Sequence, residues 1–170
     1  MRLILMGVSG SGKTTLGQDL AARTGWPFLD GDDFHTPQAR AKMAAGLGLS
    51  DGDRQPWLER LRAELLALPE VILACSSLRH SYRDVLRVPD ARFVFLNVPQ
   101  SLLLERLQER GGRSGHEHFA HADLLPSQLQ TLEPPDRGEA DVLTLHVTAQ
   151  DSSADLTRLT LSALGIADAR

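Results

Sequence analysis

The chain contains the octapeptide Gly7-Val8-Ser9-Gly10-Ser11-Gly12-Lys13-Thr14, which matches the pattern G-x-x-x-x-G-K-[ST] at every fixed position. The mostly apolar run 2–6 before it is typical of a buried strand, and Leu16 and Leu20 after it have helical spacing. In a strand–loop–helix unit of this kind, the backbone N–H groups of the loop and of the first helical turn form a cradle for phosphate groups. The octapeptide therefore predicts a nucleotide-binding site.

The residue types in this loop suit that chemistry. Its three glycines permit positive φ and a close approach of backbone to phosphate. Lys13 supplies an ammonium group that follows charge between the β- and γ-phosphates, and Thr14 offers a hydroxyl oxygen to Mg²⁺. The residues predicted to contact the nucleotide here are Gly7, Ser9, Gly10, Ser11, Gly12, Lys13, Thr14 and Thr15.

Length and composition limit the classes of protein to which this chain can belong. Its 170 residues, 42% hydrophobic and 24% charged, predict one globular domain spanning 1–170. A net charge of −4 argues against a nucleic-acid partner, which would require a basic face. Cys75 is the only cysteine, which favours a reducing compartment such as the cytoplasm. We expect no signal peptide and no membrane span. The sequence does not determine the oligomeric state, and a homodimer is compatible with it.

Further apolar runs alternate with helical patterns along the chain. The predicted strands are 26–29, 71–75, 93–98 and 142–147, and Pro56 is expected to open the helix that ends before Pro69. This alternation predicts a three-layer α/β fold with a mostly parallel five-stranded sheet. The segments 31–65 and 111–131 would lie beyond the carboxyl ends of strands, where open α/β sheets bind ligands.

Two carboxylates, Asp30 and Asp32, follow the second predicted strand. Strand alternation would place both beside the phosphates and turn Asp33 elsewhere. Asp30 would then hold a water of the Mg²⁺ shell, and Asp32 would accept a proton or hydrogen bond from a substrate hydroxyl. The alternative is a turn with solvated carboxylates. These residues leave the role of the neighbouring His35 undecided.

Arg106 and Arg110 are four residues apart and share one helix face just before a glycine- and histidine-rich segment. An arginine at this place can stack on adenine or reach the transferring phosphoryl group. The alternative is a solvated face on which both arginines pair with neighbouring glutamates. The histidines after them lack a pattern that completes a four-ligand metal site.

Beyond the phosphate loop, the sequence resembles the gluconokinases, which are P-loop small-molecule kinases related to shikimate and nucleoside monophosphate kinases. The resemblance covers nearly the whole chain, with Ala39 and Arg79 as departures from the usual Asn and Lys. It is carried by the stretches Phe28-Leu29-Asp30-Gly31-Asp32, His35, Asp53-Arg54, Pro56-Trp57-Leu58, Tyr82-Arg83-Asp84, Ser127-Gln128 and Thr131-Leu132-Glu133.

The resemblance implies a nucleoside monophosphate kinase-like fold and transfer of the γ-phosphoryl group of ATP to the 6-hydroxyl of D-gluconate, with Mg²⁺. Residues 31–65 would form the substrate-binding region and 111–122 the lid. Lys13, Asp32 and Arg110 would be catalytic residues. His35, Arg54 and Arg83 would bind substrate, the two arginines as candidates for its carboxylate. The alternative is another P-loop small-molecule kinase, such as a shikimate kinase.

Overall fold

The computed structural model describes the backbone of residues 1–111 and 119–168, and the side chains of 1–109 and 124–168. The strands in this part of the chain are β1 (Arg2–Met6), β2 (Phe28–Asp30), β3 (Val71–Ala74), β4 (Ala91–Asn97) and β5 (Val142–His146). The helices are α1 (Lys13–Thr24), the 3-10 helix η1 (Gly31–Phe34), α2 (Pro37–Ala44), α3 (Asp51–Ala67), α4 (His80–Leu86), α5 (Gln100–Gly111), α6 (Phe119–Thr131) and α7 (Ser153–Leu164).

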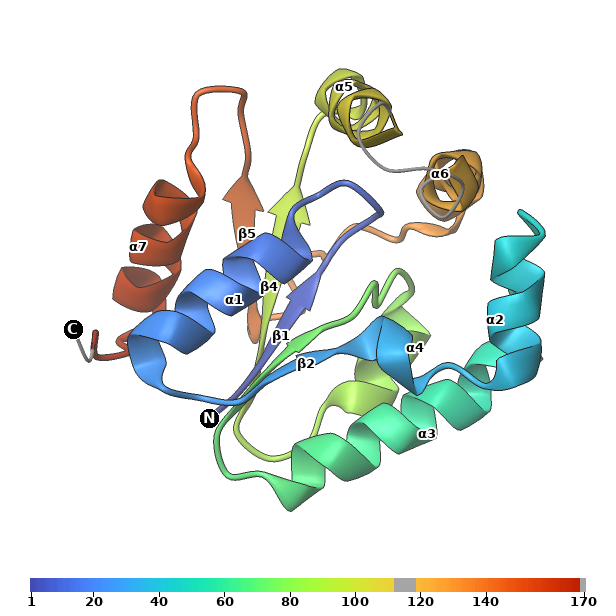
Figure 1. Cartoon of the computed structure of the whole chain (residues 1–170). Coiled ribbons are helices and arrows are strands. Elements are labelled where there is room, and N and C mark those ends of the chain that lie inside the picture. The colour runs from blue at the N-terminus through green and yellow to red at the C-terminus, as the bar shows by residue number, and fades with distance from the viewer. Residues whose placement is uncertain (112–118, 169–170) are drawn as a thin grey trace.

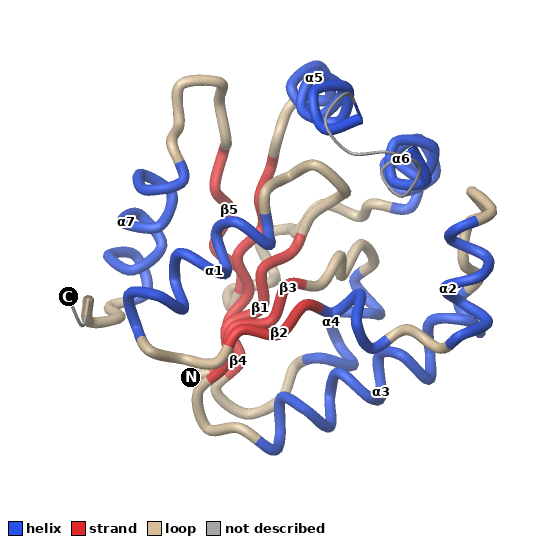
Figure 2. Tube along the Cα trace, in the orientation of Figure 1, coloured by secondary structure: helices blue, strands red, loops and turns tan. Residues whose placement is uncertain are grey.

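The five strands form one sheet in the order β2-β3-β1-β4-β5, and every pairing is parallel. Helices α1 and α7 lie on one face of the sheet and α3 and α4 on the other (Figure 1). This confirms the predicted three-layer α/β fold, in which parallel strands require helical crossovers. Because β1 is the central strand, the phosphate loop that follows it emerges at the middle of the sheet (Figure 2).

The hydrophobic core has two halves, one on each face of the sheet. In β1, Leu3 and Leu5 pack with residues of α1 and α7, whereas Ile4 and Met6 pack with residues of α3 and α4. All four side chains are fully buried. Successive residues of a strand point to opposite faces, so a strand covered on both sides must be apolar throughout. The continuous apolar runs in the sequence follow directly from this arrangement.

Two helices begin earlier than the sequence predicts. Helix α3 begins at Asp51 because Ser50 and Asp53 form a capping box, so Pro56 lies inside the helix and does not open it. The residues 124–132 also predict a helix, and the helix α6 that contains 124–131 begins earlier, at Phe119. Within the described residues, no helix is long and apolar enough to cross a membrane.

Candidate active site

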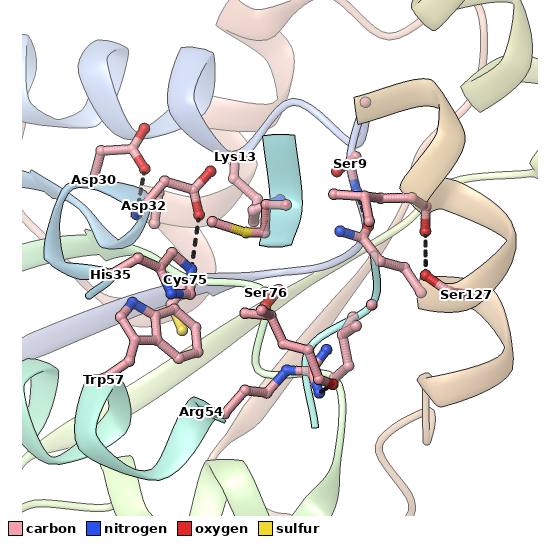
Figure 3. A pocket seen from close by; sticks show the side chains of 18 of the residues that line it. Ser9, Lys13, Asp30, Asp32, His35, Arg54, Trp57, Cys75, Ser76 and Ser127 are labelled. Carbon is pink, nitrogen blue, oxygen red and sulfur yellow. Dashed lines mark hydrogen bonds and ion pairs between the residues drawn. The ribbon is translucent and has the colours of Figure 1, made fainter. Parts of the chain in front are cut away.

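A cavity of about 280 Å³ lies at the carboxyl ends of β1, β2 and β3. Its walls come from the phosphate loop, from Asp30 with η1, from the α2–α3 segment, from the residues after β3, and from α6. Figure 3 shows Lys13, Asp32 and Arg54 among the side chains that border this one cavity. Segments that are far apart in the sequence are therefore brought together where parallel α/β sheets bind ligands.

The phosphate loop has the backbone conformation that its glycines predict. Gly7, Gly10 and Gly12 have φ of 143°, 81° and 100°. A Cβ on Gly7 would lie 3.2 Å from the Leu96 carbonyl oxygen, so the loop also needs glycine there for space. The Lys13 ammonium donates to the carbonyl oxygens of Gly7 at 2.9 Å and Val8 at 3.1 Å. The loop thus curls around the lysine and places a positive charge at its centre.

Thr14 and Asp30 supply oxygens that suit Mg²⁺. The Thr14 hydroxyl donates to Asp30 Oδ2 at 3.1 Å, in a hydrogen bond that is exposed to solvent. Oxygen ligands are those that Mg²⁺ prefers, and one or two protein oxygens suffice when nucleotide phosphates and water complete its shell. The described residues contain no group of three or more His, Cys, Asp or Glu that could hold a metal by themselves. The residues present therefore fit a cation shared with a nucleotide.

The structure corrects the geometric argument made for Asp32. Only Asp30 ends strand β2, and Asp32 lies in η1, where its backbone N–H donates to Asp30 Oδ1 at 3.1 Å. The Asp32 side chain is 68% exposed and borders the cavity together with Lys13. Asp32 therefore reaches the cavity through a capped 3-10 turn, not through strand alternation.

His35 is held in one orientation beside Asp32. Its ring stacks on Trp57 with centroids 4.4 Å apart, and Trp57 Nε1 donates to the Gly31 carbonyl at 2.7 Å. His35 Nε2 lies 3.7 Å from Asp32 Oδ1, while the buried Nδ1 has no hydrogen-bond partner among the described residues. Burial lowers the pKa of His35 below its usual 6.5, although the Asp32 carboxylate opposes the shift. At neutral pH the ring is therefore mainly uncharged, with one nitrogen as donor and one as acceptor.

Arg54 borders the cavity and is supported from behind. Its Nη1 donates to the Leu49 carbonyl and lies 3.4 Å from the Tyr82 hydroxyl, and the guanidinium stands 5.5 Å from the centre of the Tyr82 ring. Asp51 and Asp53, which follow the N-cap of α3, pair with other cations. The arginine is thus fixed at the cavity wall by an aromatic face and a carbonyl, not by a carboxylate.

The structure contradicts the predicted substrate role of Arg83. This side chain is 1% exposed and lies outside the cavity. Its Nε and Nη2 donate to both oxygens of Glu139 at 2.7 and 2.6 Å, and Nη1 donates to the carbonyls of Ser77 at 3.2 Å and Glu133 at 3.1 Å. Each guanidinium nitrogen is therefore engaged by the protein, and Arg83 ties α4 to the segment before β5.

Arg106 lies on the other side of the phosphate loop. Its Nη1 is 3.3 Å from the Ser11 carbonyl oxygen and 3.5 Å from that of Gly10. With Thr15 it borders a second hollow of about 280 Å³, between the loop and the start of α7. The side chain of Arg110, the segment 112–118 and the side chains of the rest of the predicted lid 111–122, with its histidines, lie outside the described residues, whereas the backbone of 119–122 forms the start of α6.

Gln128, to which the sequence assigned no role, contacts the phosphate loop directly. Gln128 Oε1 accepts a hydrogen bond from the Ser9 backbone N–H at 2.7 Å. The two residues are 119 positions apart, and although Ser127-Gln128 is part of the family resemblance, nothing in that stretch indicates a contact with the phosphate loop. Only the folded arrangement of α6 against the loop brings them together.

Comparison with known proteins agrees with this architecture. A family model described as shikimate kinase matches residues 9–161. The chain is 46% identical over 139 residues to a gluconokinase of Gluconobacter oxydans, covering 78% of this chain and 75% of that protein. It is 42% identical over 150 residues to a thermosensitive gluconokinase of Escherichia coli, covering 85% and 78%. A solved gluconokinase structure from Sinorhizobium meliloti 1021 matches with a TM-score of 0.82 and 39% identity, over 96% of this chain and 91% of that one.

Such identity over most of the chain shows the family, because relatives this similar share the fold and the phosphate loop. The chain therefore belongs to the gluconokinase family of ATP-dependent P-loop kinases, within the group that the shikimate kinase model describes.

Proposed function

We propose that this protein transfers the γ-phosphoryl group of ATP to the 6-hydroxyl of D-gluconate, giving 6-phospho-D-gluconate. The observation that carries the proposal is one cavity bordered by Lys13 of the phosphate loop, by Asp32 and by Arg54. A site for the phosphoryl donor, a carboxylate able to accept a hydrogen bond from the substrate hydroxyl, and a cation for the substrate carboxylate would therefore share a single space. The relatives named as gluconokinases support the choice of acceptor.

Lys13 and the loop amides would carry most of the electrostatic work. Phosphoryl transfer spreads negative charge over the oxygens of the transferring group, so catalysis depends on positioning and charge stabilisation. The loop presents N–H groups at a helix N-terminus, and Lys13 lies inside its curve. Mg²⁺, held with the nucleotide by Thr14 and Asp30, would supply further positive charge to the phosphates.

Asp32 would orient the acceptor hydroxyl. Its carboxylate borders the cavity beside the phosphate loop and is free to accept a hydrogen bond from a substrate O–H. His35, kept neutral by burial and fixed by Trp57, would bind a further sugar hydroxyl with its donor or acceptor nitrogen. The nucleotide contacts predicted for Thr15 and Arg106 are supported by their position at the border of the second hollow, beside the phosphate loop. The contact predicted for Arg110 stays a prediction.

Arg54 would distinguish a sugar acid from a neutral sugar. A guanidinium binds a carboxylate through two parallel hydrogen bonds, and the support from Leu49 and Tyr82 holds it ready for that contact. A neutral sugar would leave the arginine desolvated without a partner. Rejection of glucose can therefore reach roughly 10⁴-fold.

The test is a set of matched substitutions measured with gluconate and ATP. We expect Lys13→Ala to lower kcat by roughly 10²–10³-fold with unchanged circular dichroism. Asp32→Asn should be far more damaging to kcat than Asp33→Asn, its neighbour outside the cavity. Arg54→Leu should lower kcat/KM for gluconate strongly and leave ATP affinity unchanged. If Asp33→Asn were the worse of its pair, or Arg54→Leu still used gluconate well, these roles would be wrong.

We also propose a cytoplasmic location, which the single buried cysteine supports. The net charge of −4 supports the prediction that nucleic acid is not a partner. A homodimer stays a prediction, and light scattering on the purified protein would test it.

A further inference from the structure

Helix α6 presents one face to the cavity. Leu124, Ser127 and Gln128, spaced three and four residues apart, all border it, and α6 packs beside α5 (Figure 1). The Ser127 hydroxyl donates to the Leu124 carbonyl at 2.8 Å within its own helix. Gln128 instead reaches across to the phosphate loop at Ser9. Among the described side chains of α6, Gln128 is thus the polar group that joins this helix to the loop.

The contact with Ser9 fixes which way round the Gln128 amide lies. A backbone N–H can only donate, so the atom 2.7 Å from Ser9 N must be the amide oxygen. The NH₂ group is then the other branch of the amide. It carries two donors and has no acceptor among the described residues. A pair of oriented, neutral N–H donors therefore stands at the phosphate-loop end of the cavity.

We propose that Gln128 is a further phosphoryl-contacting residue, whose NH₂ group donates to an oxygen of the phosphoryl group in transfer. This rests on the proposed function, because it assumes that the cavity receives the γ-phosphoryl group of ATP. Two observations favour this target over the sugar acid. Gln128 is anchored on the same loop that holds Lys13, and the carboxylate-binding candidate Arg54 stands on a different segment of the wall.

The anchoring explains why glutamine suits this position. Its oxygen is held by the loop, so the donor moves with the phosphate cradle and needs little reorganisation when charge develops. A glutamate would keep the oxygen for Ser9 but would lose both donors and face the phosphates with a negative charge. A methionine would keep the length of the side chain and lose both polar groups.

The first measurement is the kinetics of Gln128→Met and Gln128→Glu, with Gln130→Met as the matched control. Gln130 is exposed on the same helix, two residues along. A hydrogen bond to a charged group corresponds to roughly 10- to 100-fold, and we expect kcat of both Gln128 variants to fall by that factor. KM for gluconate should stay within about threefold, and Gln130→Met should match the wild type.

The second measurement does not depend on the acceptor. We compare the affinity for ADP alone with that for ADP with beryllium fluoride, which imitates the γ-phosphoryl group. In the wild type the fluoride complex should bind more tightly than ADP alone. In both Gln128 variants the ratio of these two affinities should fall roughly 10-fold or more, and Gln128→Met should keep the affinity for ADP. The protein's failure to use gluconate would overturn the proposed function and leave this readout valid.

The remaining outcomes overturn the inference. Equal losses for ADP and for its fluoride complex would mean that Gln128 only shapes the loop. If kcat falls but ADP with beryllium fluoride still binds as much more tightly than ADP alone as in the wild type, the contact is not with the phosphoryl group. Unchanged kinetics in both variants would leave Gln128 with no part in the reaction. If Gln128→Met does not fold, Gln128→Glu, which keeps the bond to Ser9, decides the question.

Discussion

Replacing Arg83 by methionine should destabilise the fold and leave substrate binding intact. The guanidinium is 1% exposed and engages both oxygens of Glu139 as well as backbone carbonyls. Methionine fills a similar volume but donates no hydrogen bond, so the Glu139 carboxylate and these carbonyls would lose a buried partner.

The size of the loss follows from the contacts that remain. Breaking a buried ion pair by removing one partner costs about 3–5 kcal/mol. Arg87 also donates to Glu139, so the carboxylate keeps one cation, and we expect the lower end, about 3 kcal/mol. For a chain of this length that corresponds to a fall in Tm of about 6–12 °C. Arg158, a 70% exposed partner of Asp155, provides the control, and Arg158→Met should cost at most about 1 kcal/mol.

The assay combines thermal unfolding with steady-state kinetics at a temperature where Arg83→Met is folded. We expect the lower Tm together with an unchanged KM for gluconate. The double variant Arg83→Met/Glu139→Met should lose less than the sum of the two single losses, since the two side chains share one interaction. A Tm within about 2 °C of wild type, combined with a large rise in KM for gluconate, would refute the structural role and restore Arg83 to the substrate site.

Three further outcomes follow from the same structure. The hydrogen bond from Arg83 lowers the pKa of Glu139 from 4.5 to about 2, so the ionised carboxylate stabilises the fold fully above pH 4.5 and less as the pH falls toward 2. The difference in Tm between wild type and Glu139→Gln should therefore shrink between pH 4.5 and 2, and a constant difference would contradict this. Gly17→Ala should lower Tm, because the new Cβ would lie 2.3 Å from Phe28 Cε2, and the cost of overpacking, about 1–3 kcal/mol, exceeds the gain of about 1 kcal/mol in helix propensity. A raised Tm would show that Phe28 moves aside freely. Burial raises the pKa of the Cys75 thiol to about 11, so iodoacetamide at pH 8 should label the unfolded chain and spare the native protein, and rapid native labelling would disprove its burial.

The sheet and the phosphate loop could be predicted because their signals are local. A strand covered on both faces must be apolar where it is buried, as β3 is throughout and β1 is over residues 3–6, and a loop that surrounds phosphate needs glycines at fixed places. Strand boundaries differed by a few residues, since a pattern of apolar residues does not show where hydrogen bonding stops. The start of α3 was misplaced because Pro56 outweighed the capping box of Ser50 and Asp53, which the structure shows to be formed.

The rest of the site depends on contacts between distant segments. Arg83 matched a family pattern beside the substrate region, but its partner Glu139 lies 56 residues away and no sequence signal pairs them. Gln128 reaches Ser9 only because α6 folds back over the loop. Asp32 borders the same cavity as Lys13, but not through the strand alternation predicted for it, since its position comes from the cap that Asp30 provides for η1.

The acceptor specificity of the wild-type protein tests the central claim most directly. The measurement is ADP release from ATP and Mg²⁺ with gluconate, shikimate, glucose or a nucleoside monophosphate as acceptor, with the phosphorylated product identified by mass. We predict that gluconate stimulates ADP release and gains one phosphoryl group, and that the other three leave the rate at the background of ATP hydrolysis. Stimulation by shikimate or a nucleoside monophosphate, with none by gluconate, would contradict the account.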